Sequence, residues 1–428
     1  METKELYSYF LQCTGIATDT RKINPGSLFF ALKGDNFDAN AFTEEALLKG
    51  AAYVVIDNPK YKISDKTLLV NNSLEALQEL ARHHRNQLGL PVIALTGSNG
   101  KTTTKELINA VLSKKYTTCA TIGNLNNHIG VPLTLLSFTK DTEIGIVEMG
   151  ANHQLEIEFL CSIAEPNFGY ITNFGKAHLE GFGGYEGVIK GKSELYNYLI
   201  ANTKTAFVNL DDPIQKEKTK DLSRYTFAVD DYNCDVRIET VEANPMVAVK
   251  YNGIDIKSHL IGIYNATNIS AAIAIGTYFK IGDSKIQQAI EEYIPTNNRS
   301  QLLEKNSNKI ILDAYNANPS SMKAAIENFL QLDTENGKLA ILGDMFELGP
   351  ESPAEHQKIV TSLVNEENIE ICFVGKDFYA YKTDTEHLHF YETYDAFKSA
   401  FANLKPAGKT ILIKGSRGMA LERTLDLI

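Results

Sequence analysis

The stretch from Leu90 to Leu112, LPVIALTGSNGKTTTKELINAVL, restricts the fold of this chain more than any other. It opens with a short apolar run, which is typical of a strand buried on both faces. The turn TGSNGKT follows, and the apolar residues beyond it recur at the spacing of one helix face. Strand, glycine-rich turn, Gly-Lys-Thr and helix together indicate a phosphate-binding loop. The alternative, an ordinary turn with a chance Gly-Lys-Thr, does not account for the strand and helix around it.

Each residue type in this turn has a physical role toward phosphate. Gly97 and Gly100 allow backbone N–H groups to turn inward, aided by the positive end of the following helix. Lys101 is expected to reach the β- and γ-phosphates, and the Thr102 hydroxyl to ligate Mg²⁺. The spacer before Gly-Lys is shorter than in the common pattern, since only two residues separate the two glycines. The predicted nucleotide-loop residues are Gly97, Ser98, Asn99, Gly100, Lys101, Thr102 and Thr103.

Length and composition limit the classes of protein to which the chain can belong. With 428 residues, and about 150 residues per domain, we expect three domains. The net charge of −11 argues against a broad basic surface for nucleic acid. No run approaches the roughly 18 apolar residues of a membrane span, and the N-terminus shows no signal-peptide pattern. Five scattered cysteines without CxxC spacing indicate free thiols in a reducing cytosol, so we expect a cytoplasmic protein.

Residues 1–88 predict a small α/β unit without an obvious nucleophile or metal cluster. The expected elements are strands at 26–32, 51–57 and 67–72 and helices at 42–49 and 74–88. The polar signature of this region is Asp19-Thr20-Arg21, followed by Lys33. These residue types are equally typical of turns and exposed surface.

Residues 89–298 begin with alternating strands and helices, a pattern typical of a parallel sheet covered on both faces. Polar residues follow three expected strands, at Glu148, Thr172-Asn173 and Asp211-Asp212. Ligands bind at the carboxyl ends of strands in such sheets, so these residues are site candidates. Residues 235–262 change to short strands with Asn and Gly turns, and 265–275 predict a helix.

Residues 299–428 predict a second doubly wound unit. The expected elements are strands at 309–315, 338–344, 369–375 and 409–416 and helices at 320–332, 353–367 and 418–427. The polar segments DAYNANPSS, GDMFELG and KGSRG each follow a strand. Clusters at successive strand ends of one sheet converge on one edge, where a binding site is expected.

Several polar residues of the central region could bind a metal ion or substrate only if the fold brings them close to other site residues. Glu148 is a strand-end acid that could meet the Mg²⁺ of Thr102, because Mg²⁺ takes one or two carboxylates plus phosphate oxygens. His178 and Lys192 follow a strand end. Spacing alone fits a structural or exposed position equally well for His178, and it favours an ordinary surface position for Lys192. The asparagines of NLNNHIGVPLTLL favour turns, so spacing assigns no further role to Asn126 and Asn127.

Taken in order, TGSNGKTTTKE, EMGAN, TNFGKAHLEGFG and GKSELY resemble the central domain of the Mur ligases. This resemblance implies an ATP-dependent enzyme that joins an amino acid or peptide to a UDP-N-acetylmuramoyl peptide. GNLNNHIGVPLTLL, YNANP, GDMFELG and KGSRG are similar to the branch of the family that adds D-alanyl-D-alanine to a UDP-N-acetylmuramoyl tripeptide. The resemblance covers nearly the whole chain, and the order of the motifs is more specific than any one motif.

The resemblance implies a three-domain α/β fold. Its parts would be a small uridine-nucleotide domain at 1–88, a central P-loop parallel-sheet ATPase domain at 89–298, and a Rossmann-like doubly wound domain at 299–428 that binds the dipeptide. It also implies ATP, two Mg²⁺ ions, small-molecule substrates, no nucleic-acid partner, no membrane span and a monomer. In the implied reaction ATP phosphorylates the tripeptide carboxylate, and the dipeptide amine attacks the acyl phosphate.

The resemblance also implies roles for individual residues. Lys192 matches a lysine that carries a carbamate, which adds an oxygen ligand for a metal. The implied catalytic residues are Lys101, Glu148, His178 and Lys192, and the implied metal ligands are Thr102, Glu148, His178 and Lys192. Nucleotide contacts implied outside the loop are Asn268, Arg299 and Asp313. Implied substrate contacts are Thr20, Arg21, Lys33, Asn126, Asn127, Tyr315, Asn316, Asn318, Lys414 and Arg417.

The chain departs from the family pattern at two positions, and other functions remain open. Tyr264 stands where many members have His, and Asp313 lacks the second acid that often accompanies it. Alternatives are a sister ligase adding diaminopimelate or lysine, a folate-polyglutamate ligase, an ATP-binding protein without ligation, and a P-loop kinase acting on a hydroxyl. The sister that adds the third residue usually carries Asp-Asn-Pro-Arg, which is missing here.

Overall fold

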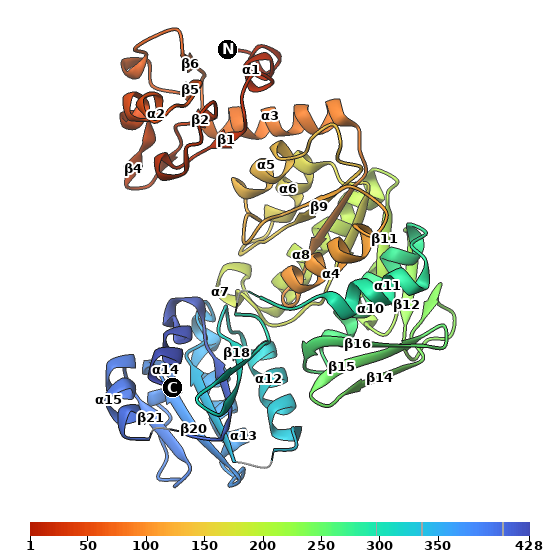
Figure 1. Ribbon diagram of the computed structural model, residues 1–428, viewed down its shortest axis with the longest axis vertical. Coiled ribbons are helices and arrows are strands. Elements are labelled where there is room, and N and C mark those ends of the chain that lie inside the picture. Colours follow the sequence, from red (N-terminus) through yellow and green to blue (C-terminus); the bar gives the residue numbers. More distant parts are fainter. Residues whose placement is uncertain (297, 335–336, 405) are drawn as a thin grey trace.

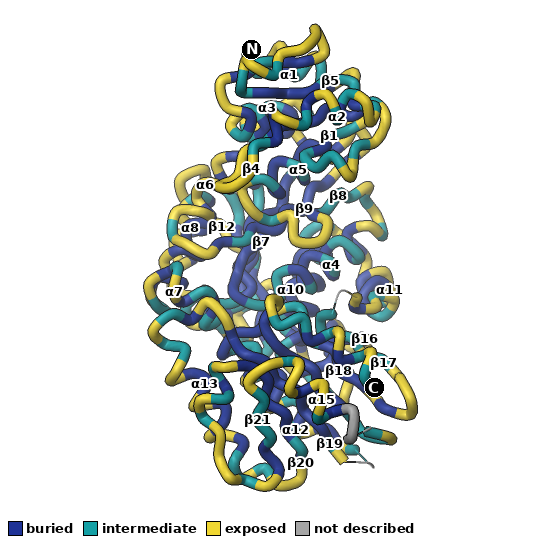
Figure 2. Tube along the Cα trace, turned by 90° about the vertical axis from the view of Figure 1, so that its left-hand side faces the viewer, coloured by how far each residue is buried: buried dark blue, intermediate teal, exposed yellow. Residues whose placement is uncertain are grey.

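The computed structural model describes residues 1–296, 298–334, 337–404 and 406–428. Three α/β units follow one another along an arc, with the N-terminal unit at one end and the C-terminal unit at the other (Figure 1). Buried residues line the strands inside each unit, whereas loops and outer helix faces are exposed (Figure 2). Among the described residues, no helix is long and apolar enough to cross a membrane.

The N-terminal unit is built on a parallel sheet with strand order β1-β2-β5-β6. Its elements are α1 (Thr3–Phe10), β1 (Ile16–Ala17), β2 (Leu28–Phe30), β3 (Lys33–Gly34), β4 (Phe37–Asp38), α2 (Thr43–Leu48), β5 (Tyr53–Ile56), β6 (Thr67–Leu69) and α3 (Ser73–Leu88). The Asn72 side chain accepts hydrogen bonds from the N–H groups of Leu74 and Glu75 in the first turn of α3, and Gly89 ends the helix with a φ of 64°. Figure 1 shows α3 running from this unit onto the central one.

The central unit contains a seven-stranded parallel sheet with the order β13-β12-β11-β10-β7-β9-β8. Its strands are β7 (Val92–Thr96), β8 (Thr118–Ala120), β9 (Ile144–Glu148), β10 (Phe168–Ile171), β11 (Thr205–Asn209), β12 (Ser223–Ala228) and β13 (Val236–Arg237). The chain leaves β7 toward β8 and β9 on one side and returns through β10 on the other. Such a switch point opens a crevice at the strand ends, so the turn after β7 lies where ligands bind.

Helices cover this sheet, and a small antiparallel sheet packs beside it. The helices are α4 (Lys101–Leu112), α5 (Gly130–Leu136), α6 (Glu156–Ala164), α7 (Leu179–Phe182), α8 (Tyr185–Ala201), α9 (Pro213–Lys218), α10 (Asn265–Tyr278) and α11 (Asp283–Glu292). The antiparallel strands are β14 (Thr240–Ala243), β15 (Met246–Tyr251) and β16 (Ile254–Ile261). They share a core with α4, α10 and α11, which anchors α10 close to the turn after β7.

The C-terminal unit has a six-stranded sheet with the order β17-β18-β22-β19-β20-β21. Its strands are β17 (Gln301–Lys305), β18 (Asn308–Asp313), β19 (Lys338–Gly343), β20 (Ile369–Val374), β21 (Leu388–Tyr391) and β22 (Thr410–Lys414). Its helices are α12 (Pro319–Gln331), α13 (Ser352–Leu363), α14 (Lys376–Tyr379) and α15 (Tyr394–Leu404). Parallel pairing sets Asp313 opposite Lys414, so two of the predicted polar clusters meet at one edge.

Several elements of the C-terminal unit differ from those expected there. β17 pairs antiparallel with β18 where the sequence pattern predicts no strand, and α14, β21 and α15 also lie outside the expected elements. Residues 418–427, expected as one helix, form 3₁₀ turns at Arg417–Met419 and Leu421–Leu427. Ala420 has a φ of 48° and interrupts the helix, while Leu421 is buried against the sheet. Packing of the chain end therefore overrides the helical pattern.

Candidate active site

Two glycines give the turn between β7 and α4 a shape that side chains would block. Gly97 has a φ of 143°, and a Cβ there would lie 2.0 Å from Thr172 Oγ1 at the end of β10. Gly100 has a φ of 77°, and a Cβ there would lie 2.7 Å from Asn268 Oδ1 on α10. Both backbone conformations favour glycine. The loop therefore packs closely between the end of β10 and α10.

The Lys101 side chain folds back over the loop. Its Nζ donates to the carbonyl oxygens of Gly97 at 2.7 Å and Ser98 at 3.3 Å. Burial lowers the pKa of Lys101 to about 8, and nearby Arg299 also lowers it while Glu148 raises it. A phosphate in the loop would stabilise the protonated amine by direct pairing.

A hydroxyl and a carboxylate lie together beside the loop. Thr102 and Glu148 are buried, and Thr102 Oγ1 donates to Glu148 Oε2 at 2.9 Å. Asn126 Nδ2 donates to the other carboxylate oxygen at 2.8 Å. Among the described residues no group of three His, Cys, Asp or Glu side chains could hold a metal alone. The oxygen donors nevertheless fit Mg²⁺, which usually completes its shell with phosphate oxygens and water.

Lys192 is a buried amine on α8, only 1% exposed. Its Nζ donates to the carbonyl oxygen of Ala151 at 3.0 Å and lies 4.9 Å from the Phe182 ring centroid. Burial, and then the charge of Lys101, hold the pKa of Lys192 well below its usual value. The neutral amine is the form that reacts with CO₂, so this environment fits a carbamate.

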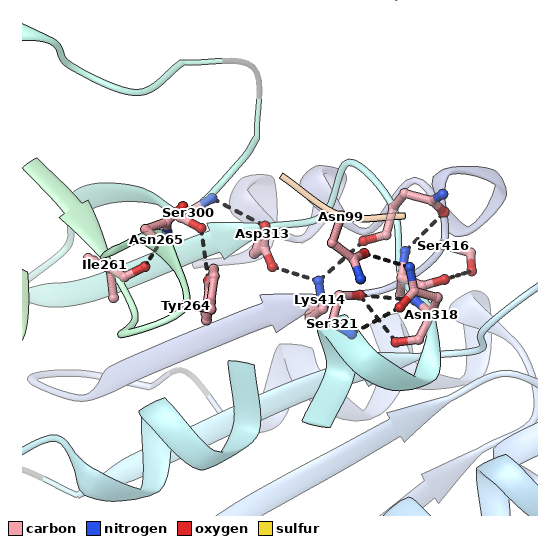
Figure 3. Close-up of polar contacts among 12 residues, drawn as sticks. Asn99, Ile261, Tyr264, Asn265, Ser300, Asp313, Asn318, Ser321, Lys414 and Ser416 are labelled. Atoms are coloured by element: carbon pink, nitrogen blue, oxygen red, sulfur yellow. Dashed lines mark hydrogen bonds and ion pairs between the residues drawn. The ribbon is translucent and has the colours of Figure 1, made fainter. Parts of the chain in front are cut away.

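The C-terminal side of the site is a chain of polar contacts (Figure 3). Lys414 Nζ donates to Asp313 Oδ2 at 2.6 Å and to the Asn316 carbonyl oxygen at 3.2 Å. The other Asp313 oxygen accepts from the Ser300 N–H at 3.2 Å, and Ser300 Oγ lies 3.0 Å from the Tyr264 hydroxyl. Burial raises the pKa of Tyr264 well above its usual range, which keeps this hydroxyl protonated.

One further contact joins the units around the loop, and another orders the C-terminal unit beside it. Asn318, which caps α12, donates its Nδ2 to Asn99 Oδ1 at 2.7 Å, and Figure 3 shows the two side chains facing each other. The Arg299 guanidinium stacks 3.6 Å above the Tyr315 ring. Arg299 Nε is buried and has no hydrogen-bond partner among the described residues. This N–H is therefore a donor available to a bound ligand.

These walls enclose a cavity of about 1160 Å³ between the central and C-terminal units. It brings together most of the predicted site residues: Ser98, Asn99, Gly100, Lys101, Thr102, Thr103, Asn126, Asn127, Glu148, His178, Asn268, Arg299, Asp313, Tyr315, Asn316, Asn318 and Lys414. Gly97 and Lys192 do not line the cavity, but Lys192 donates a hydrogen bond to the carbonyl oxygen of Ala151, which does. Asn127 also has the turn role typical of asparagine, because its Oδ1 accepts hydrogen bonds from the N–H groups of Ile129 and Gly130.

Four predicted substrate residues do not line this cavity. Thr20, Arg21 and Lys33 belong to the N-terminal unit, where Arg21 pairs with Asp19 at 2.7 Å. Arg417 pairs with Glu422 at 2.6 Å. The role of these residues in substrate binding stays a prediction.

The structure adds groups that the residue predictions do not include. Tyr264 and Asn265 line the cavity, and Asn265 Oδ1 accepts from Asn268 Nδ2 at 2.7 Å, which orients the predicted nucleotide contact. Glu347 Oε2 lies 2.5 Å from His178 Nδ1. The only sequence signal for Glu347 was its place in GDMFELG, a polar segment after a strand.

The sequence also matches described protein families and known relatives. It matches the Mur ligase middle domain over residues 95–276, the Mur ligase glutamate ligase domain over 298–417 and the Mur ligase family catalytic domain over 12–85. A UDP-N-acetylmuramoyl-tripeptide–D-alanyl-D-alanine ligase of Bacillus subtilis is 35% identical over 97% of this chain and 93% of its own length. The chain belongs to the Mur ligase family.

Solved structures of Mur ligases share the whole architecture. MurF from Acinetobacter baumannii is 31% identical, with a TM-score of 0.87 covering 99% of this chain and 98% of its own. The MurF ligase of Thermotoga maritima, solved in complex with ADP, is 26% identical, with a TM-score of 0.84 covering 98% and 97%. The predicted three-domain α/β fold is thereby confirmed as that of a Mur ligase.

Proposed function

We propose that this Mur ligase uses ATP to join D-alanyl-D-alanine to UDP-N-acetylmuramoyl tripeptide, forming a peptidoglycan precursor. The observation that carries the proposal is the shared cavity, in which the phosphate loop faces the strand-end cluster of the C-terminal unit. The carboxylate whose oxygen accepts the phosphoryl group is the one whose carbon the amine then attacks, so both sets of groups must face one space. The names of full-length relatives support the choice of substrates.

The first step transfers the γ-phosphoryl group of ATP to the free carboxylate of the tripeptide. The products are ADP and an acyl phosphate. Lys101 leaves its loop carbonyls to pair with the phosphates, and backbone N–H groups of the loop hold their oxygens. Asn268 and Arg299 hold the nucleotide from α10 and from the start of the C-terminal unit. Positioning and neutralisation of charge account for most catalysis of this type.

Mg²⁺ would be held by Thr102 and Glu148 at one position, and by His178 and carbamylated Lys192 at a second. The bound metal supplies positive charge that offsets the charge developing on the phosphoryl oxygens. Asn126 keeps the Glu148 carboxylate in one orientation through the 2.8 Å hydrogen bond. The burial of Lys192 favours the neutral amine needed for carbamate formation.

In the second step the dipeptide amine attacks the acyl carbon, a tetrahedral intermediate forms, and phosphate leaves to give the amide. We assign dipeptide binding to the C-terminal domain, through Asn316, Asn318 and Lys414, and the uridine nucleotide to the N-terminal domain. The proposed domains are 1–88, 89–298 and 299–428. The enzyme is expected to act as a monomer in the cytoplasm, where ATP is available.

A coupled assay tests this proposal. Purified protein with ATP, Mg²⁺ and UDP-N-acetylmuramoyl tripeptide should release phosphate only when D-alanyl-D-alanine is added, with one amide product per phosphate by mass spectrometry. Replacement of the dipeptide by diaminopimelate, lysine or glutamate should give no product. No phosphate release with the dipeptide would contradict the proposal, and a stable phosphorylated product would indicate a kinase.

A further inference from the structure

The loop that carries His178 contacts the C-terminal unit at Glu347. His178 Nδ1 lies 2.5 Å from Glu347 Oε2. The Glu180 N–H donates to the Glu347 carbonyl oxygen at 3.2 Å, so the two backbones also touch. His178 and Glu347 have φ values of 54° and 63°, which few residues other than glycine adopt. Two strained backbone positions, from separate units, thus place two side chains against each other.

An ion pair between the same units, Lys176–Glu355, provides a comparison. Lys176 Nζ lies 2.8 Å from Glu355 Oε1 on α13, and the Lys176 N–H donates to Ser320 Oγ at 2.9 Å. Lys176 does not line the cavity, and it is not a metal ligand in the proposed function. This pair joins the units without touching a group assigned to the metal.

We propose that Glu347 is a positioning residue that orients His178 for the second Mg²⁺ when the C-terminal unit is docked. This inference rests on the proposed function, because that function assigns a metal to His178. The carboxylate lies against Nδ1, which makes no hydrogen bond to any described residue in this arrangement, and Nε2 is left as the ring nitrogen that can ligate the ion. Metal-binding histidines commonly donate their other ring N–H to a carboxylate, which fixes the tautomer and the ring orientation.

The geometry makes this metal position dependent on the third domain. Glu347 follows β19, whereas His178 follows β10, so only the docking of the two units brings them together. Without Glu347 the imidazole could rotate or change tautomer, and the affinity for the ion would fall. The domain that delivers the amine would therefore also help to complete the metal site of the activating step.

The test compares Glu347→Gln with the matched variant Glu355→Gln. Isothermal titration calorimetry would measure how the affinity for the β,γ-imido analogue of ATP depends on Mg²⁺ concentration, which needs no turnover. Loss of an outer-shell carboxylate typically weakens metal binding by about 10- to 100-fold, so Glu347→Gln should raise the half-saturating Mg²⁺ concentration by that order. Glu355→Gln should shift it less than about twofold.

His178→Ala completes a double-mutant cycle with Glu347→Gln. If Glu347 acts through His178, the Glu347 substitution should have no further effect on the Mg²⁺ dependence once His178 is removed. Equal shifts in Glu347→Gln and Glu355→Gln, or additive effects with His178→Ala, would overturn the inference and make Glu347 an ordinary interdomain contact.

Failure of the proposed function would be recognised separately. It would appear as wild-type protein that releases no phosphate with tripeptide and dipeptide, whereas the titration of the ATP analogue requires neither substrate. Small-angle X-ray scattering of the two Gln variants gives the radius of gyration, and so tests whether either one separates the units. If Glu347→Gln had a larger radius of gyration than the wild type and Glu355→Gln did not, the change in Mg²⁺ dependence would result from separation of the units. That outcome would also overturn the inference.

Discussion

The central and N-terminal units both carry candidate binding groups, but they hold them in opposite ways. Thr102, Glu148 and Lys192 are at most 5% exposed and are hydrogen-bonded to other parts of the central unit. In the N-terminal unit the Arg21 side chain is 84% exposed and pairs with Asp19, two residues away. The groups proposed to act in the reaction are therefore held in place by burial and hydrogen bonds. Arg21, predicted to recognise the uridine nucleotide, is exposed and paired only with its neighbour Asp19.

This difference predicts different kinetic effects. Removal of a preorganised group should reduce the rate of the chemical step, because that group acts mainly in the transition state. Removal of an exposed group should mainly raise KM, because it contributes to binding alone. The substitutions below test this contrast, from the largest expected effect to the smallest.

Lys101→Ala should have the largest effect. It removes the cation proposed to neutralise the transferring phosphate, and we expect kcat to fall by about 1000-fold or more. Substrate-dependent phosphate release measures the loss. Lys114→Ala, which removes a surface lysine paired with Glu292, is the matched control and should leave kcat unchanged. If kcat of Lys101→Ala fell by less than about tenfold, the proposed difference between buried catalytic groups and exposed binding groups would not hold.

Lys192→Arg should rank second. Arginine keeps a positive charge but cannot form a carbamate at neutral pH, so we expect kcat to fall by about 100-fold or more. In the wild type, depletion of CO₂ should lower the rate and added bicarbonate should restore it. Bicarbonate should not restore Lys192→Arg. A variant with normal activity, or a wild type indifferent to CO₂, would refute the carbamate.

The sequence predicts the phosphate loop and Glu148 well, because their positions depend on local sequence patterns. The spacing of Gly97, Gly100, Lys101 and Thr102 fixes the loop, and Glu148 follows from the end of an apolar strand. Parallel pairing then brings the residues together at neighbouring strand ends. This arrangement needs only the rule that ligands bind at a switch point of the sheet.

The interdomain contacts could not be predicted in the same way. The pair His178–Glu347 depends on how two units dock, and neither its distance nor its existence follows from spacing. β17 was missed because its pairing with β18 is set by the neighbouring strand. The 3₁₀ turns at the chain end arise from burial of Leu421, which overrides a weak helical pattern.

Lys414→Met should have an intermediate effect, since Lys414 is buried but belongs to the wall formed by the C-terminal unit. Its side chain is 2% exposed, and its loss leaves Asp313 without a cationic partner. We expect KM for the dipeptide to rise by about 10-fold or more and the melting temperature to fall. The double variant Asp313→Asn/Lys414→Met should recover stability but not KM. If KM recovers with stability, Lys414 is structural only.

Arg21→Ala should have the smallest effect and tests the exposed side of the contrast. Because the Asp19 pair is solvent-exposed, its loss should leave the melting temperature unchanged. If Arg21 contacts the uridine nucleotide, KM for the UDP-tripeptide should rise several-fold, with kcat and the KM for ATP unaltered. The closest control is Lys22→Ala, on the same turn but without an assigned role.

A fall in kcat for Arg21→Ala would show that the N-terminal domain takes part in the chemical step. The division between buried groups that act in the reaction and exposed groups that only bind substrate would then no longer hold. Equal KM values in both variants would remove Arg21 from the binding site and leave the division of the other groups intact.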